Sequence, residues 1–204
     1  MSAGFQIALK DLEIRGAGNL LGVEQHGHIA AVGFDLYCRL LAEAVEELRG
    51  KAPAARKAPP VSIDLPLAAY LPPDYVADDA TRLNLYQRLS LATTEEDVGK
   101  IALEIRDRFG VPPVEALNLL FLVQLKAAAA RAGIQSIAAE GQQIVLRLGE
   151  GARPDRAELV RRFGRSLSLS PHQVRLDRRR LGPGWQVLLQ EVVEACGSGT
   201  AVAS

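Results

Sequence analysis

The fold of this chain is decided by the stretch PVEALNLLFLVQLKAAAARAG, residues 113–133. A proline suits the first position of a helix, and the glycine at the end of the stretch is typical of a helix stop. The residues between them are apolar almost all round the helix. An amphipathic surface helix would instead keep one polar face toward water. The stretch therefore predicts a buried helix, opened by Pro112 or Pro113.

Two more helices are predicted immediately before this stretch. The first is DATRLNLYQRLSLA, residues 79–92, which Asp78 or Asp79 can cap. The second starts at Thr93 or Thr94 and runs to Gly110. Its first turn is acidic, which suits the positive end of the helix dipole. Residues 78–133 are thus predicted to form three helices.

Short strands are predicted on both sides of the helical region. Residues 61–65 alternate apolar and polar side chains, and IQSIAAEGQQIVLRLGEG, residues 134–151, reads as two strands turning at Glu140 and Gly141. RPDRAELVRRFG, residues 153–164, reads as a helix with Pro154 in its first turn. Residues 166–180 and 185–196 fit either a strand or a helix.

The first 60 residues are organised differently. Apolar spacing predicts helices near residues 4–15 and 34–48, separated by glycines, and KAPAARKAPP, residues 51–60, has the composition of a linker. We therefore predict an α+β chain with four parts. Residues 1–50 form a helical hairpin, 51–60 a linker, 61–196 a helix-rich domain with a small, mostly antiparallel sheet, and 197–204 a disordered tail.

The sequence matches no familiar catalytic or metal site. GAGNLLG, residues 16–22, lacks the spacing and the preceding strand of a dinucleotide-binding loop, and no P-loop is present. His26 and His28 leave a zinc ion short of ligands. Cys38 and Cys196 lie far apart in the sequence, which argues against a disulfide framework and suits a reducing cytoplasm. No apolar run reaches the length of about 18 residues that a membrane-spanning helix needs, so we expect no membrane contact. We name no catalytic or metal-binding residue.

Two arginine features have open interpretations. Arg15 ends the first predicted helix, where it can either cap that helix or bind a carboxylate or phosphate. Residues 153–180 hold nine arginines and three acidic residues, a net charge of +6. They can contact phosphates or form a solvated face. The candidate phosphate contacts are Arg161, Arg162, Arg165, Arg178, Arg179 and Arg180.

Residues 4–45 resemble a known family. GFQIALKDLEIRGAGNLLGVEQHGHIAAVGFDLYCRLLAEAV is similar to the end of the motor in bacterial transcription-repair coupling factors (Mfd). That segment is the TRG motif, named for translocation in the related helicase RecG, a helical hairpin and loop that links ATP hydrolysis to movement on double-stranded DNA. The resemblance implies a coupling role for Arg15 and Gln25, with Gly16, Gly18 and Gly22 shaping the loop.

The resemblance covers most of the chain from residue 4 to about residue 133, and it is loose beyond that. After the linker it implies the family's C-terminal regulatory domain, which masks the UvrA-binding module of the same protein. We therefore expect the chain to be the C-terminal portion of an ATP-dependent DNA translocase of nucleotide excision repair. The helicase motor with its ATP and Mg²⁺, and the contacts to RNA polymerase and UvrA, would belong to the preceding part of that parent. This chain would hold no cofactor and be inactive alone. The alternative is a free-standing protein-interaction module without a motor.

Overall fold

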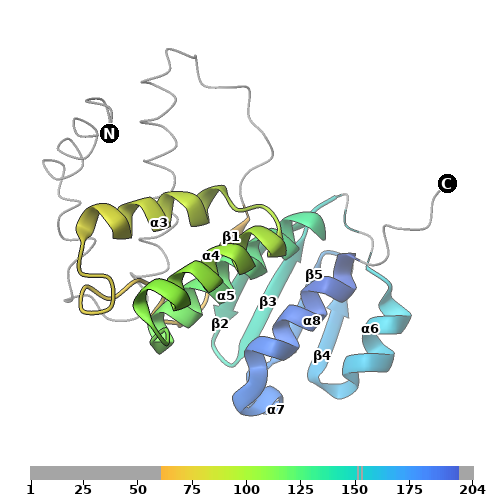
Figure 1. Cartoon of the computed structure of the whole chain (residues 1–204). Helices are drawn as coiled ribbons and strands as arrows, with labels where there is room; N and C mark the ends of the chain where they lie inside the picture. Colours follow the sequence, from red (N-terminus) through yellow and green to blue (C-terminus); the bar gives the residue numbers. More distant parts are fainter. Residues whose placement is uncertain (1–60, 151, 153, 198–204) are drawn as a thin grey trace, which may run out of the picture.

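A computed structural model describes residues 61–150, 152 and 154–197 (Figure 1). In chain order the elements are β1 (Ser62–Asp64), α3 (Asp79–Leu91), α4 (Glu95–Phe109), α5 (Val114–Arg131), β2 (Ile134–Glu140), β3 (Gln143–Leu148), α6 (Arg156–Phe163), η2 (Gly164–Ser166), β4 (Leu167–Ser170), β5 (Gln173–Asp177), α7 (Arg178–Leu181), η3 (Gly182–Gly184) and α8 (Trp185–Gly197). The helices and strands of this region confirm the predicted α+β class.

The strands form one five-stranded sheet in the order β1-β2-β3-β5-β4. β1 pairs with β2 in parallel, and the other three pairings are antiparallel, so the sheet is mostly antiparallel as predicted. Figure 1 shows α5 and α8 lying across one face of this sheet, with α4 and then α3 stacked beyond α5. The domain is therefore built as helices layered on one face of a sheet.

The long apolar helix α5 lies at the centre of the core. It packs against β1 and β2, against α8 and against α4. Its fully enclosed side chains include Leu119 and Leu125, each 0% exposed. The predicted burial is thus confirmed for most of the helix. Its first turn differs, because Val114 and Leu117 are exposed.

The helix starts follow the predicted capping residues. Asp78 caps α3, where its carboxylate accepts a hydrogen bond from the Thr81 backbone N–H at 2.7 Å. Thr94 caps α4 and forms a reciprocal capping box with Asp97. Hydrogen bonds from Thr81 lower the pKa of Asp78. Pro113 is the N-cap of α5. Local sequence therefore places all three helix starts.

The region after residue 150 resolves the ambiguous stretches. Residues 167–170 and 173–177 form the antiparallel pair β4 and β5. Residues 185–197 form α8, whose buried side chains recur at helical spacing, as Leu189, Val192, Val193 and Cys196. The prediction that Pro154 lies in the first turn of α6 is wrong. It precedes Asp155, which caps α6 through the Glu158 backbone N–H, so the proline lies before the first turn.

The predicted N-terminal hairpin and linker, residues 1–60, and residues 198–204 of the predicted tail lie outside the described residues, and the proposed domain division stays a prediction. Gly197, the first residue of that tail, is the last residue of α8. None of the described helices is both long enough and apolar enough to cross a membrane.

Cys196 offers a chemical test of the packing of α8. Its side chain is fully buried, and burial raises the pKa of its thiol to about 11. In a Cys38→Ser variant at pH 8, we expect a thiol reagent to modify Cys196 at least a hundred-fold more slowly in native protein than in urea, on the order expected for so small a thiolate fraction.

The same raised pKa has a consequence for stability. The unfolded chain loses the Cys196 proton at lower pH than the folded chain, so this group lowers the free energy of unfolding as pH rises from about 9 toward about 11. In the thiol-modification experiment on the Cys38→Ser variant, equal rates in native and urea-denatured protein would contradict the buried position of Cys196.

Candidate functional site

The predicted site residues fall into two groups. Arg15, Gly16, Gly18, Gly22 and Gln25, the proposed coupling residues, lie outside the described residues. The candidate phosphate contacts lie on α6, η2 and α7. We call this second set the arginine surface; it comprises Arg161, Arg162, Arg165, Arg178, Arg179 and Arg180.

The fold brings the two runs of the arginine surface together. Nη1 of Arg180, on α7, donates a hydrogen bond to the backbone carbonyl of Arg165, in η2, at 2.8 Å. These two residues are fifteen positions apart in sequence. The antiparallel hairpin β4–β5 between them returns the chain to the same end of the sheet. Two runs that are separate in sequence thus form one surface.

Carboxylates offset part of the charge of the arginine surface. Arg161 forms an ion pair with Glu158, and the Arg180 Nε lies 3.4 Å from the Asp177 carboxylate. Arg162 reaches toward Glu191 of α8 at 3.7 Å. The side chains of these three arginines are all at least 45% exposed, so each pair contributes little to stability. Their guanidinium groups remain accessible from solvent.

Two members of the arginine surface lie over aromatic rings. The guanidinium carbon of Arg162 lies 5.1 Å from the centre of the Phe163 ring, and that of Arg178 lies 5.9 Å from the Trp185 ring. Cations over ring faces are attracted by the ring quadrupole. Trp185 in turn contacts Phe121 of α5 edge-on, with ring centres 6.4 Å apart. The aromatic rings thus support these side chains from the core side.

A second region, which the sequence did not indicate, is the irregular segment 65–78 between β1 and α3. Irregular backbone near a core needs side-chain partners for its polar groups. Asn118 of α5 donates to the Ala68 carbonyl at 2.9 Å, and the Tyr86 hydroxyl of α3 accepts from the Leu71 N–H at 2.8 Å. Side chains from two helices therefore hold this segment in place.

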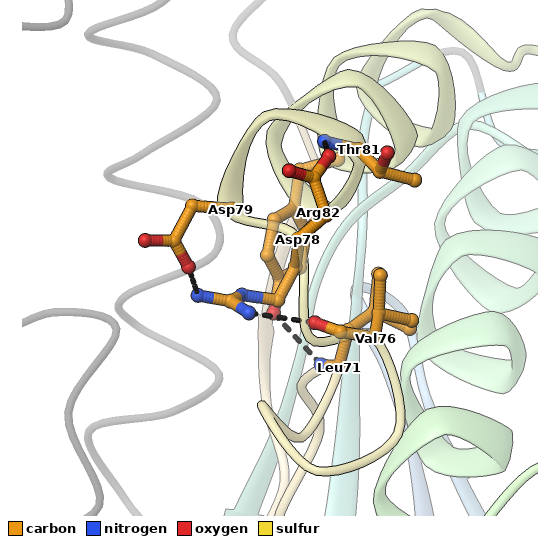
Figure 2. Close-up of polar contacts among 7 residues, drawn as sticks. Leu71, Val76, Asp78, Asp79, Thr81 and Arg82 are labelled. Carbon is orange, nitrogen blue, oxygen red and sulfur yellow. Dashed lines mark hydrogen bonds and ion pairs between the residues drawn. The ribbon is translucent and has the colours of Figure 1, made fainter.

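Arg82 of α3 holds the end of the same segment. Figure 2 shows its guanidinium between the Val76 carbonyl and the Asp79 carboxylate. Nη1 donates to the Val76 carbonyl at 2.7 Å, and Nη2 forms an ion pair with Asp79. Among the residues that the structure describes, Arg82 is the one buried charged residue, at 4% exposure. A buried charge is tolerated only with such partners.

The turn between α4 and α5, together with the first turn of α5, exposes apolar side chains beside these anchored residues. The Tyr75 hydroxyl donates to the Gly110 carbonyl at 2.8 Å, and the Tyr75 ring packs edge-on against Phe109. The next residues carry exposed side chains, with Val111 at 85%, Val114 at 62% and Leu117 at 52% exposure. We call these three residues the apolar surface.

The backbone on both sides of the apolar surface is fixed by hydrogen bonds. Val111 comes directly after the anchored Gly110, and Leu117 directly before the anchored Asn118. Val114 and Leu117 are three residues apart on one helix, so they share a face. An exposed apolar cluster on a fixed frame is typical of a protein-binding surface. Sequence reasoning missed it, because the apolar pattern around α5 predicts burial all round.

An ionic cluster joins α3 to α4. Arg88 of α3 and Arg108 of α4 both bind the Glu104 carboxylate, at 2.6 and 2.9 Å. The hydrogen bond from Arg88, then that from Arg108, lowers the pKa of Glu104. Glu104 therefore stays ionised near neutral pH, and the cluster persists there. No group of three or more potential metal ligands occurs within the described part of the chain.

The comparisons with known proteins point to one family. Residues 65–159 match the family model of the TRCF domain. The transcription-repair-coupling factor of Staphylococcus epidermidis is 42% identical over 155 residues, which is 76% of this chain and 13% of that protein. That of Mycobacterium bovis is 43% identical over 168 residues, which is 78% of this chain and 14% of that protein.

A solved structure is similar in fold. The crystal structure of the C-terminal domain of a transcription-repair coupling factor superposes with a TM-score of 0.53 at 15% identity, covering 69% of this chain and 92% of that one. This likeness concerns the fold alone. The chain spans only about an eighth of the length of the curated relatives that it matches. The chain is thus homologous to the transcription-repair-coupling factors, and residues 65–159 match their TRCF domain.

Proposed function

We propose that this chain is the C-terminal part of a transcription-repair-coupling factor, an ATP-dependent translocase on double-stranded DNA that acts in nucleotide excision repair. Residues 61–197 act as its autoinhibitory docking domain and mask the UvrA-binding module of the same protein. The observation that carries the docking role is the apolar surface, because three exposed apolar side chains project from a frame anchored on both sides. The homology to coupling factors supports a role in DNA repair.

Residues 1–50 act in this proposal as the element that links ATP hydrolysis to translocation. Arg15 is the residue that senses the state of the motor, with Gln25 and the glycines at 16, 18 and 22 forming its loop. A rigid guanidinium fork suits this role, because it binds carboxylates and phosphates through two hydrogen bonds. ATP and Mg²⁺ would bind in the parent motor, and RNA polymerase and UvrA would bind other domains of the parent.

The apolar surface fits a module that must both bind and release. A small apolar contact excludes water and stabilises the docked state, while a contact of a few side chains remains weak enough to open. The anchoring bonds of Tyr75 and Asn118 hold the backbone of the surface in one conformation. Docking then costs little conformational entropy at this site. The occupant that we propose is the UvrA-binding module of the parent.

A paired substitution in the full-length coupling factor tests the docking role. With Val114→Asp and Leu117→Asp together, we expect at least ten-fold more UvrA to be captured than by the wild type, because two carboxylates cannot be buried in an apolar contact. Capture is measured in a pull-down with immobilised coupling factor.

The control is Val187→Asp, since Val187 of α8 is exposed to about the same degree as Val114, at 65% against 62%, but lies outside the apolar surface. It should capture UvrA at the wild-type level. If the double variant also captures at the wild-type level while it retains its native far-ultraviolet circular dichroism, the apolar surface does not mask the UvrA-binding module.

A further inference from the structure

Charge is divided unevenly between the two halves of the described domain. Residues 61–150 hold eight basic and twelve acidic side chains, a net charge of −4. Residues 154–184 hold eight arginines and three acidic side chains, a net charge of +5. The chain as a whole has a formal net charge of zero. The elements that carry the arginine surface therefore carry a local positive charge, while the rest of the chain is net negative.

The basic side chains of this surface are all arginines. No lysine occurs between residues 154 and 184. A guanidinium group is planar, always charged and shaped to bind two oxygens of a phosphate or carboxylate, so an all-arginine surface favours oxyanions over a general attraction to negative charge. Several guanidinium groups on one continuous, exposed surface also suit a ligand with repeated charges better than a single small anion.

The members of the surface differ in how strongly they are already neutralised. Arg161, Arg162 and Arg180 each face a carboxylate. Arg165 and Arg179 are exposed, and they form hydrogen bonds through backbone atoms, namely the Arg165 carbonyl and the Arg179 N–H. Arg178 lies over Trp185. The positive charge available to a ligand is thus concentrated at Arg165, Arg178 and Arg179.

The aromatic rings decide between double-stranded and single-stranded nucleic acid. Proteins that bind single strands stack the bases on exposed aromatic side chains. Here Phe163 is buried, while Trp185 is half-buried beneath Arg178. Neither of these two rings is free for a base to stack on, whereas the phosphate backbone on the outside of a duplex can bind guanidinium groups without such a ring.

We propose that the arginine surface of α6, η2 and α7 is a binding site for the phosphate backbone of double-stranded DNA, with Arg165, Arg178 and Arg179 as its principal contacts. This contact is separate from the docking of the apolar surface, and neither role requires the other. Because the contacts are to phosphates, binding should be independent of base sequence.

The salt dependence of binding tests this site directly. The full 204-residue chain is titrated into a labelled duplex of about 30 base pairs, and anisotropy is followed between about 50 and 200 mM salt. Each neutralised phosphate steepens the dependence, so three contacts predict a loss of affinity of about 40-fold over this range. In the double variant Arg165→Gln with Arg179→Gln, one remaining contact predicts a loss of only about 3–4-fold.

The control variant removes the same charge elsewhere. Arg106→Gln with Arg131→Gln neutralises two exposed arginines in the acidic half, and should keep the wild-type salt dependence. Three results would overturn the proposal. They are an unchanged slope in the Arg165 and Arg179 variant, an equal change in both variants, and displacement of the duplex by poly-glutamate as effectively as by unlabelled duplex. The last result would assign the surface to an acidic polypeptide. UvrA capture, measured in parallel, reports on the docking role independently.

Discussion

Leu125→Ala will lower the free energy of unfolding by about 3–4 kcal/mol, the largest effect that we expect from a single truncation in this domain. Leu125 is 0% exposed and lies on α5, which packs against the sheet on one side and against α8 and α4 on others. Removal of its side chain loses the transfer free energy of burial. It also leaves a cavity, because elements packed on several sides cannot all move inward together.

Urea denaturation followed by circular dichroism measures this loss. The matched control is Leu117→Ala, on the same helix but 52% exposed, for which we expect less than about 1 kcal/mol. Both changes replace leucine by alanine in a helix, so their helix propensities cancel and the difference reports burial. A loss at Leu125 no larger than that at Leu117 would contradict the central position of α5.

Arg82→Ala will cost about 3 kcal/mol, because it removes a buried charged side chain together with its hydrogen bond to the Val76 carbonyl. Val76 is 0% exposed, so its carbonyl has little water to replace the lost donor. Arg82→Met keeps much of the aliphatic stem and should cost about 1 kcal/mol less than alanine, which separates packing from polar contact.

Asp79→Ala distinguishes the two partners of Arg82. The Asp79 side chain is 80% exposed, so we expect its removal to cost less than about 1 kcal/mol. Chemical denaturation of the three variants should therefore rank their losses as alanine at 82, then methionine at 82, then alanine at 79. If Asp79→Ala proves as costly as Arg82→Ala, the ion pair rather than the Val76 carbonyl explains the burial of the arginine.

Several elements could be predicted because their determinants are local. Capping side chains mark the starts of α3 and α4, and Pro113 that of α5, while the alternation of residues 61–65 marks β1. The hairpin of β2 and β3 follows from a turn at Gly141, which has a φ of +59° that glycine adopts without strain. Each of these signals lies within a few residues of the structure it predicts.

The ambiguous stretches illustrate the opposite case. Residues 173–177 and 185–196 both contain buried apolar side chains between polar ones, yet one is β5 and the other is most of α8. β5 is a strand because it fills the space between β3 and β4 and satisfies the backbone of both. α8 is a helix that covers the face of the sheet beside α5. Period alone does not separate such short stretches.

The candidate sites divide in the same way. The arginines could be identified from the sequence as a run of positive charge. Their meeting on one surface, through the hydrogen bond from Arg180 to the Arg165 carbonyl, depends on the β4–β5 hairpin. The apolar surface could not be predicted from the sequence, because the exposure of Val114 and Leu117 depends on the fact that no other element covers their side chains on the first turn of α5. The anchoring of segment 65–78 could not be predicted either, because its hydrogen bonds join residues that are 6 to 50 positions apart in the sequence.

Local sequence was therefore sufficient for the starts of α3, α4 and α5, the first hairpin, the α+β class and the resemblance to the coupling factors. Those features rest on side-chain chemistry and periodicity within short windows. Tertiary structure alone decided the sheet order, the secondary structure of residues 166–180 and 185–196, the burial of Arg82 and the exposure of the apolar surface. These features depend on which surfaces meet, and the free energy of burial is set by contacts between residues that are far apart in the chain.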